Sequence, residues 1–496
     1  MIDQLISELV AYGLENGLID DADKVYVTNG LLELFQRQDY QEPEKLGKPR
    51  KLQLILDDLL EYALSQGILE DDTVTMRDLL DTKIMGILTP APSVVRKIFE
   101  EKYQVSPKAA TEFYYHFSQA TNYIRTDRII KDEKWETDTE FGKMDITINL
   151  SKPEKDPRDI AKAGTARKSG YPACLLCRGN EGYADHLSHP ARQNHRIIPI
   201  TLCGEQYYLQ YSPYVYYNEH CIIFNKNHIP MAINEIIFNK LLDFVKQFPH
   251  YTAGSNADLP IVGGSILSHD HFQGGGYVFA MAKAPYELEF DLERYPDIHA
   301  GIVKWPMSVI RLQGRTTESI VEVADHILTK WRGYSDPEVS IFSETDGIPH
   351  NTITPIARMR GDLYELDLVL RNNITTEDCP LGFFHPHAEY HHIKKENIGL
   401  IEVMGLAVLP ARLKKEMAEL EQAILHHENL RQNTTMAAHA DWAEEWMPKY
   451  EITESNIHSI VQKEIGIVFT KVLENAGVYK RTEEGKAAFK RFIESL

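Results

Sequence analysis

Residues 263–276 read GGSILSHDHFQGGG, a stretch that places two histidines and a glutamine at alternate positions between two groups of glycines. Side chains alternate across a β-strand, so a strand here would turn His269, His271 and Gln273 to one face. The glycines permit sharp turns and let another group approach the backbone closely. Two imidazoles and an amide beside open backbone suit nucleophilic chemistry on a phosphate. The simpler interpretation is a pair of buried or solvated histidines, which is common for an isolated His-x-His.

The composition is that of a large globular chain with an acidic balance. The 496 residues are too many for one simple domain, and they carry a formal net charge of −20 with 43% hydrophobic and 25% charged residues. A nucleic-acid-binding protein needs a basic face, so we expect no nucleic-acid partner. No apolar run is long enough to span a membrane, so we expect no membrane association. The odd number of five cysteines does not indicate a disulfide framework, and we expect a cytoplasmic protein.

The first 130 residues or so have the spacing of helices, and they contain an internal echo. Leucines recur at helical intervals around residues 5–14 and again around residues 56–64. The two copies share five matched positions at a constant offset: Leu9, Tyr12, Leu14, Gly17 and Asp21 in the first, and Leu59, Tyr62, Leu64, Gly67 and Asp71 in the second. We therefore predict two similar units of helix plus turn, which are too few for a solenoid.

The middle of the chain is rich in strand-like runs and the end returns to helices. Residues 145–150 alternate like a strand, and four further runs have strand character: 207–211, 221–224, 277–280 and 363–370. A helical pattern near residues 232–247 separates two strand-rich halves, and Thr482 is a candidate start for a helix in the last part of the chain.

These patterns predict an α+β fold with a mixed core of two related halves and helical extensions at both ends. The predicted division is a helical N-terminal region at 1–140, a first half at 141–245, a second half at 246–410 and a helical tail at 411–496.

Two cysteines three residues apart suggest a metal site. Cys174 and Cys177 have the spacing of a thiolate pair that closes on zinc, which needs four ligands. His228 follows a predicted strand, and His269 is the candidate fourth ligand. Such a site would be structural, because no coordination position stays open for water. The alternative is two buried thiols, or a redox pair, with unrelated histidines.

A second histidine cluster lies in residues 384–392, which read FHPHAEYHH. His385 and His387 would share a face of an extended segment. They could bind iron or zinc, contact phosphate, or lie in a solvated loop, and their spacing does not choose among these roles.

Taken in order, these motifs resemble the galactose-1-phosphate uridylyltransferases, of the histidine-triad-like superfamily, and in particular their second class. The resemblance rests on the Cys174–Cys177 pair with Gly179 and Asn180, on Phe224 with His228, on the run SHDHFQ at 268–273 and on the run HPH at 385–387. It covers about half of the chain, residues 165–410.

The resemblance implies a fold of two histidine-triad-like halves with an antiparallel sheet core, and a reaction. UDP-glucose and galactose 1-phosphate would give glucose 1-phosphate and UDP-galactose, a step of galactose metabolism, by ping-pong transfer through a uridylylated histidine. The nucleophile would be His271, and Gln273 would hydrogen-bond the transferred group. The resemblance also implies a homodimer and two metal sites. The ligands would be Cys174, Cys177, His228 and His269 for a structural zinc, and Glu287, His350, His385 and His387 for a second metal, iron or zinc.

The residues themselves support this chemistry. A neutral imidazole is a good nucleophile near pH 7, provided that its other nitrogen gives its proton to a fixed acceptor such as a backbone carbonyl. Gln273 can donate to a non-bridging phosphate oxygen without adding charge. The candidate substrate contacts are Lys152, Lys155, Arg178 and Gly274, although exposed lysines and arginines are often only solvated.

Two departures from the family pattern stand out. Asp270 occupies a position where the better-known class has proline, and residues 403–408 lack the glutamate of the family's sugar-binding segment. The sugar contacts must therefore differ.

Two alternatives remain at this point. A nucleotide-sugar or dinucleoside-polyphosphate phosphorylase of the same superfamily would share His271 but pass the nucleotide to inorganic phosphate. A zinc-stabilised interaction protein without activity would not need the His271 and Gln273 face.

Overall fold

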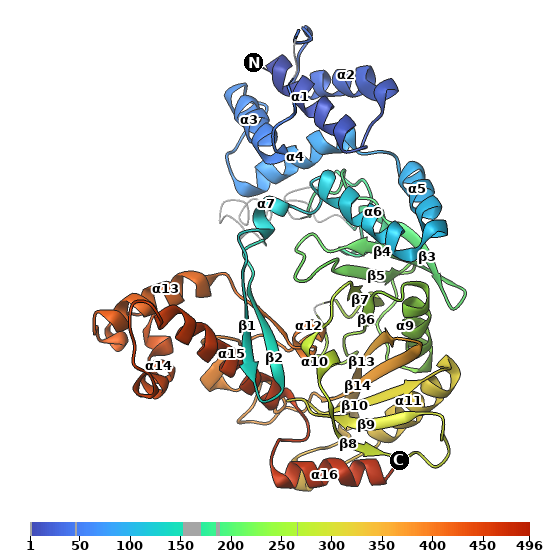
Figure 1. Cartoon of the computed structure of the whole chain (residues 1–496), viewed down its shortest axis with the longest axis vertical. Helices are drawn as coiled ribbons and strands as arrows, with labels where there is room; N and C mark the ends of the chain where they lie inside the picture. Colours follow the sequence, from blue (N-terminus) through green and yellow to red (C-terminus); the bar gives the residue numbers. More distant parts are fainter. Residues whose placement is uncertain (1, 45–46, 152–169, 185–188, 265) are drawn as a thin grey trace. The chain divides into compact units, whose positions relative to one another are not determined.

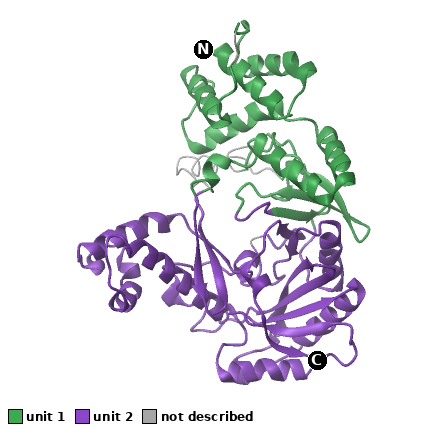
Figure 2. Ribbon diagram, in the orientation of Figure 1, with its two compact units in different colours: residues 1–131, 151–215, 221–228 green, residues 132–150, 216–220, 229–496 purple. Residues whose placement is uncertain are grey.

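The structure, a computed structural model, describes the whole chain except residues 1, 45–46, 152–169, 185–188 and 265 (Figure 1). The fold is α+β, as predicted, with helices at both ends of the chain. The chain forms two compact units, each discontinuous in sequence (Figure 2). Unit 1 comprises residues 1–131, 151–215 and 221–228, and unit 2 comprises residues 132–150, 216–220 and 229–496. The four-part division and the histidine-triad-like character of the halves stay predictions.

Unit 1 joins the N-terminal helices to a three-stranded antiparallel sheet. Its helices are α1 (Ile2–Glu15), α2 (Lys24–Leu34), α3 (Leu52–Ser65), α4 (Val74–Leu88), α5 (Pro92–Val105), α6 (Pro107–Ala120) and α7 (Thr126–Ile129). Its strands are β3 (Ile198–Leu202), β4 (Glu205–Tyr211) and β5 (Cys221–Asn225). The Tyr211 hydroxyl on β4 donates to the Thr111 carbonyl on α6 at 2.9 Å, so a helix covers this sheet.

The internal echo is confirmed at the ends of α1 and α3, which pack against each other. Both helices have 14 residues, and two residues after the end of each comes a glycine with a left-handed backbone, Gly17 at φ 64° and Gly67 at φ 70°. Glycine suits this position because it has no Cβ to clash. The same closing hydrogen bond follows in both copies, since Leu18 N donates to Gly13 O and Ile68 N to Ala63 O, each at 2.9 Å.

Unit 2 is built on a seven-stranded antiparallel sheet with the order β7-β6-β13-β14-β10-β9-β8. The strands are β6 (Thr252–Gly254), β7 (His271–Gly275), β8 (Tyr286–Phe290), β9 (His299–Val303), β10 (Val309–Gly314), β13 (Asn351–Arg360) and β14 (Leu363–Asn372). Helices α9 (Glu235–Gln247) and α11 (Thr317–Arg332) pack on it side by side (Figure 1). Asn234 begins α9, because its side chain accepts from Ile237 N at 3.2 Å.

The remaining elements of unit 2 form a smaller sheet and a helical tail. Strands β1 (Glu133–Thr139) and β2 (Gly142–Ile148) form a hairpin, and β15 (Leu406–Leu409) joins β2 in parallel. The hairpin β11 (Glu344–Thr345) with β12 (Ile348–Pro349) lies apart from both sheets. The helices are α10 (Ala280–Lys283), α12 (Leu400–Val403), α13 (Arg412–Leu425), α14 (Ala440–Trp446), α15 (Ile457–Ala476) and α16 (Glu483–Glu494). Thr482 caps α16, as predicted, by accepting from Gly485 N at 3.2 Å.

The strand prediction for residues 277–280 is wrong. The strand is β7, which ends at Gly275, and Ala280 begins the short helix α10. The pairing of β7 with β6 ends at Gly275, opposite Thr252, and the apolar side chains that follow turn into the core, where Phe279 and Met281 are buried. A short apolar run fits a buried helical turn as well as a strand, so its sequence alone could not decide.

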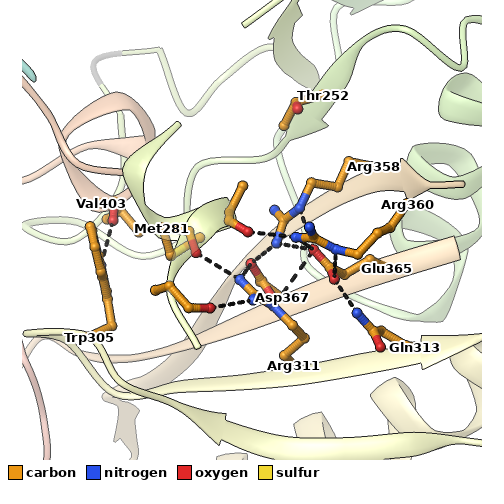
Figure 3. Close-up of polar contacts among 12 residues, drawn as sticks. Thr252, Met281, Trp305, Arg311, Gln313, Arg358, Arg360, Glu365, Asp367 and Val403 are labelled. Carbon is orange, nitrogen blue, oxygen red and sulfur yellow. Dashed lines mark hydrogen bonds and ion pairs between the residues drawn. The ribbon is translucent and has the colours of Figure 1, made fainter. Parts of the chain in front are cut away.

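Charged side chains of the large sheet, most of them buried, hold α10 against that sheet (Figure 3). On β14, Asp367 accepts from Arg311 Nε at 2.7 Å, and Glu365 accepts from Arg360 Nε at 2.6 Å. The same arginines donate to the carbonyls of the α10 turn: Arg311 to Met281 and Ala284, and Arg360 to Ala282. These charged residues therefore replace the hydrogen bonds that the end of a short helix lacks.

In the part of the chain that the structure describes, no helix is both long enough and apolar enough to cross a membrane.

Candidate active site

His271 is the first residue of β7, and this residue is 6% exposed. Its Nδ1 lies 2.7 Å from the backbone oxygen of His269. A carbonyl oxygen can only accept a hydrogen bond, so Nδ1 carries the proton and the lone pair of Nε2 is available. Burial lowers the pKa of His271, which favours the neutral ring near pH 7. This is the hydrogen bond that the sequence argument requires of a nucleophilic imidazole.

Gln273 lies two residues farther along β7 and lines the same pocket as His271. Its Oε1 lies 3.1 Å from Nε2 of His220, a residue that the sequence argument did not single out. With Oε1 engaged in this way, the amide NH₂ of Gln273 is turned away from His220.

A pocket of about 480 Å³ in unit 2 contains both side chains. Its lining combines polar side chains, glycines and two aliphatic residues: Asn256, Gly263, Gly264, His271, Gln273, Glu396, Asn397, Gly399, Leu400, Ile401 and Glu402. Gly264 cannot be replaced by a larger residue without a shift, because its Cβ would lie 2.7 Å from Nδ2 of Asn256. Gly263 and Gly264, from the glycine-rich run at 263–276, therefore form part of the pocket wall.

Apart from Gln273, the amides and carboxylates of the pocket were not predicted from the sequence. Asn256 accepts from Leu400 N at 2.9 Å, which joins the segment after β6 to α12 across 144 positions of sequence. Glu402 accepts from Lys394 Nζ at 3.0 Å and from Gly399 N at 3.2 Å. The only local signal is the spacing of Gly399 and Glu402, because a glutamate at the third position of α12 can accept from the backbone N of the residue that precedes the helix. Nothing in the sequence links that helix start to the His271 strand.

The cysteine pair lies in unit 1 with a histidine beside it. Cys174 Sγ is 3.5 Å from Cys177 Sγ, far beyond a disulfide bond length, and Cys177 Sγ is 3.2 Å from His228 Nδ1. Asn180 fixes the turn, because its Nδ2 donates to the carbonyls of Cys174 at 2.9 Å and Cys177 at 2.7 Å. Thiolates and imidazole converging in a pre-formed turn fit a zinc ion.

The structure describes two of the four other predicted substrate contacts, Arg178 and Gly274. Arg178 begins a short 3₁₀ turn in unit 1 and lies over the Tyr208 ring, with 5.8 Å to the centroid. The carbonyl of Gly274 accepts from the Tyr217 hydroxyl at 3.0 Å. Lys152 and Lys155 lie outside the described residues.

Comparison with known proteins identifies the family. Residues 17–230 match the galactose-1-phosphate uridyl transferase N-terminal domain, and residues 243–444 match the C-terminal domain. The galactose-1-phosphate uridylyltransferase of Clostridium acetobutylicum is 54% identical over 100% of both chains. The chain belongs to the galactose-1-phosphate uridyl transferase family.

Further relatives of the same name are similar over their whole length. The protein from Fusobacterium nucleatum is 52% identical over 99% of this chain and 98% of its own. That from Bacillus subtilis is 52% identical over 99% of this chain and 97% of its own. Among solved structures, yeast Ap4A phosphorylase Apa2 covers 66% of this chain and 94% of its own at 10% identity and a TM-score of 0.33, too distant to bear on function.

The four residues that family resemblance suggested for a second metal are not gathered in the structure. Within the described residues, none of the four belongs to a group of three or more potential ligands close enough to hold one ion. Glu287 pairs with Arg481 at 2.6 Å and 2.8 Å, and His350 contacts Asn373 Oδ1 at 2.8 Å and Thr345 Oγ1 at 2.9 Å.

His385 and His387 have separate partners as well. His385 Nε2 lies 3.0 Å from Oδ1 of Asn397, a pocket residue, whereas the backbone N of His387 donates to Asn475 at 3.3 Å. His385 therefore supports the pocket wall through Asn397. The alternation that put His385 and His387 on one face does not apply, because His387 leads into a 3₁₀ turn instead of a strand.

Proposed function

We propose that the protein transfers UMP from UDP-glucose to galactose 1-phosphate, giving glucose 1-phosphate and UDP-galactose. The observation that carries this proposal is the His271 ring, held by its Nδ1 on a backbone carbonyl and placed with Gln273 in one pocket. The full-length likeness to enzymes named for this activity supports the choice of substrates.

The reaction follows from His271 in two transfers. Nε2 attacks the α-phosphorus of UDP-glucose, a P–N bond forms, and the P–O bond to glucose 1-phosphate breaks as that group leaves. A phosphate oxygen of galactose 1-phosphate then attacks the same phosphorus. The P–N bond breaks, UDP-galactose forms, and Nε2 regains its lone pair. Nδ1 keeps its proton on the His269 carbonyl throughout, which stabilises the positive charge that the ring carries while uridylylated.

Gln273 and the pocket lining support the transfer. The Gln273 NH₂ would donate to a non-bridging oxygen of the moving phosphoryl group, where negative charge must be stabilised. Glu396 and Asn397 offer acceptors and donors of the kind that bind sugar hydroxyls. We assign them to the hexose, in place of the carboxylate missing from residues 403–408.

Zinc is proposed as a structural ion. Cys174, Cys177 and His228 would hold it, with His269 as the proposed fourth ligand, so that all four tetrahedral positions are filled. No second metal is part of this proposal. A homodimer and a cytoplasmic location remain expectations of the family resemblance and of the cysteine count.

Cys174→Ser should lose bound zinc and unfold at a lower temperature. Metal binding to a site present only in the folded chain adds directly to folding free energy, and a serine hydroxyl is a poor zinc ligand. Elemental analysis of the purified protein and thermal unfolding measure the two effects. Cys203→Ser, at an exposed cysteine, is the matched control and should change neither. Unchanged metal content in Cys174→Ser would show that Cys174 is not a zinc ligand and that the cysteine pair has no role in metal binding.

The choice of acceptor separates transferase from phosphorylase. After reaction with UDP-glucose, the wild-type protein should form UDP-galactose when galactose 1-phosphate is added and should form no UDP when inorganic phosphate is added instead. Product analysis by ion-exchange chromatography distinguishes the two. UDP from inorganic phosphate, with no UDP-galactose, would overturn the assignment.

A further inference from the structure

His220 lies in a short segment of unit 2, residues 216–220, that is fastened to the strand of the nucleophile. The Tyr217 hydroxyl donates to the Gly274 carbonyl at 3.0 Å, and Asn218 Nδ2 donates to the Gly276 carbonyl at 3.2 Å. Gly275 makes this approach feasible, because a Cβ there would lie 2.6 Å from the Glu219 carbonyl oxygen. The lack of a side chain at Gly275 therefore allows residues 216–220 to pack closely against the end of β7.

The His220 ring is buried between aromatic side chains and makes one hydrogen bond to a side chain. It is 2% exposed, with ring centroids 4.5 Å from Tyr217 and 5.5 Å from Tyr216. Burial lowers the pKa of His220 to about 4, so the ring is neutral near pH 7 and carries one proton. Nε2 lies 3.1 Å from Gln273 Oε1, while Nδ1 is buried with no hydrogen-bond partner in the described part of the chain.

We infer that His220 is a positioning residue that sets the orientation of the Gln273 amide for phosphoryl transfer; this inference rests on the proposed function. An amide can present either its oxygen or its NH₂ to the pocket, since the two ends have nearly the same shape. The Nε2–H of His220 donates to Oε1, so the NH₂ end is left for the phosphate. Without that donor, the amide can rotate and place a partly negative oxygen toward a negatively charged group.

The effect should fall on the chemical step. Charge on the non-bridging oxygens must be stabilised while phosphorus is transferred, and donors fixed in advance contribute more than donors that must reorient. Substrate binding draws on many other contacts. Loss of His220 should therefore lower kcat and leave the KM for UDP-glucose nearly unchanged.

The test measures glucose 1-phosphate release from UDP-glucose in single turnovers of the full-length protein. His220→Phe keeps the ring volume and removes the donor; we expect a rate about 10- to 100-fold below wild type, at most the loss known for one oxyanion donor, with KM within about twofold. His220→Gln can place an NH₂ near the position of Nε2 and should recover most of the rate. In a Gln273→Ala background, His220→Phe should cause no further loss, because its effect passes through Gln273.

Three results would overturn the inference: a wild-type rate for His220→Phe, no recovery in His220→Gln, or full additivity with Gln273→Ala. If His220→Phe is too unstable to assay, His220→Leu carries the same expectation.

A second measurement does not depend on activity. The ¹⁵N spectrum of the His220 ring should show the Nε2–H tautomer near pH 7, and the Nδ1–H tautomer would contradict the proposed orientation. A wild-type protein that fails to release glucose 1-phosphate but shows the Nε2–H tautomer would overturn the proposed function and leave the hydrogen bond standing.

Discussion

His271→Gly should lower the exchange of UDP-glucose with galactose 1-phosphate by about 10⁴-fold or more, with the protein still folded. Removal of a covalent nucleophile abolishes the only route to the intermediate, and such losses reach about 10⁶-fold in other enzymes with covalent intermediates. The fold should survive, because the ring makes one hydrogen bond, to the His269 carbonyl, and lines a pocket instead of filling the core.

The kinetic assay should be paired with thermal unfolding and with a control histidine. His458→Ala removes an exposed ring on α15, far from β7 in sequence, and should retain full activity. Turnover within about 10-fold of wild type in a folded His271→Gly protein would refute the nucleophile assignment, since no other group in the pocket is proposed to attack phosphorus.

Asp367→Asn should reduce the free energy of unfolding by about 3–5 kcal/mol, the cost of breaking a buried ion pair from one side. Asp367 is fully buried, and it accepts from Arg311 at 2.7 Å and 3.0 Å and from Arg358 at 2.5 Å. Burial alone would raise its pKa, but the two arginines outweigh burial and hold the pKa below its usual value, so the carboxylate is charged. Asparagine would leave three guanidinium groups, those of Arg311, Arg358 and Arg360, facing one remaining carboxylate, Glu365.

Urea or thermal unfolding measures this loss, and a surface ion pair gives the comparison. Glu136→Gln breaks the exposed pair between β1 and β2, with Lys143, and should leave the unfolding midpoint unchanged. Asp367→Asn should also weaken the hold on α10, because Arg311 donates to the Met281 and Ala284 carbonyls from the same guanidinium. An unfolding midpoint equal to that of wild type would show that the network adds nothing to stability.

The same network shows where strand patterns mislead. Within residues 363–370, the stretch 364–368 alternates between apolar and charged side chains, which is typical of a strand with one face in water. The strand is correctly predicted as β14, but both its faces are buried, with Glu365 and Asp367 at 0% exposure. Their partners, Arg311 on β10 and Arg358 on β13, come from other strands. Pairing across a sheet is a long-range property, so no local pattern could name them.

The residues of the candidate site fall into two groups: those that local sequence patterns identify, and those that long-range contacts bring to the site. The alternation of His271 and Gln273 and the turn at Cys174 and Cys177 are local, and the sequence was sufficient to single them out. His220 and the pocket residues Asn256 and Glu402 reach the site through chain segments tens to more than a hundred positions apart. The surroundings of Glu287 are also set by a long-range contact, because it accepts from Arg481, 194 positions later in the chain.

The most direct test of the central claim uses UDP-glucose labelled in the uridine, incubated with the purified protein and no acceptor. Intact mass and peptide mapping follow. We predict one uridylyl group per chain, on His271, with an equal amount of glucose 1-phosphate released. Label on another residue, or release of glucose 1-phosphate with no label on the protein under conditions that preserve phosphoramidates, would contradict a uridylyl-histidine at this position.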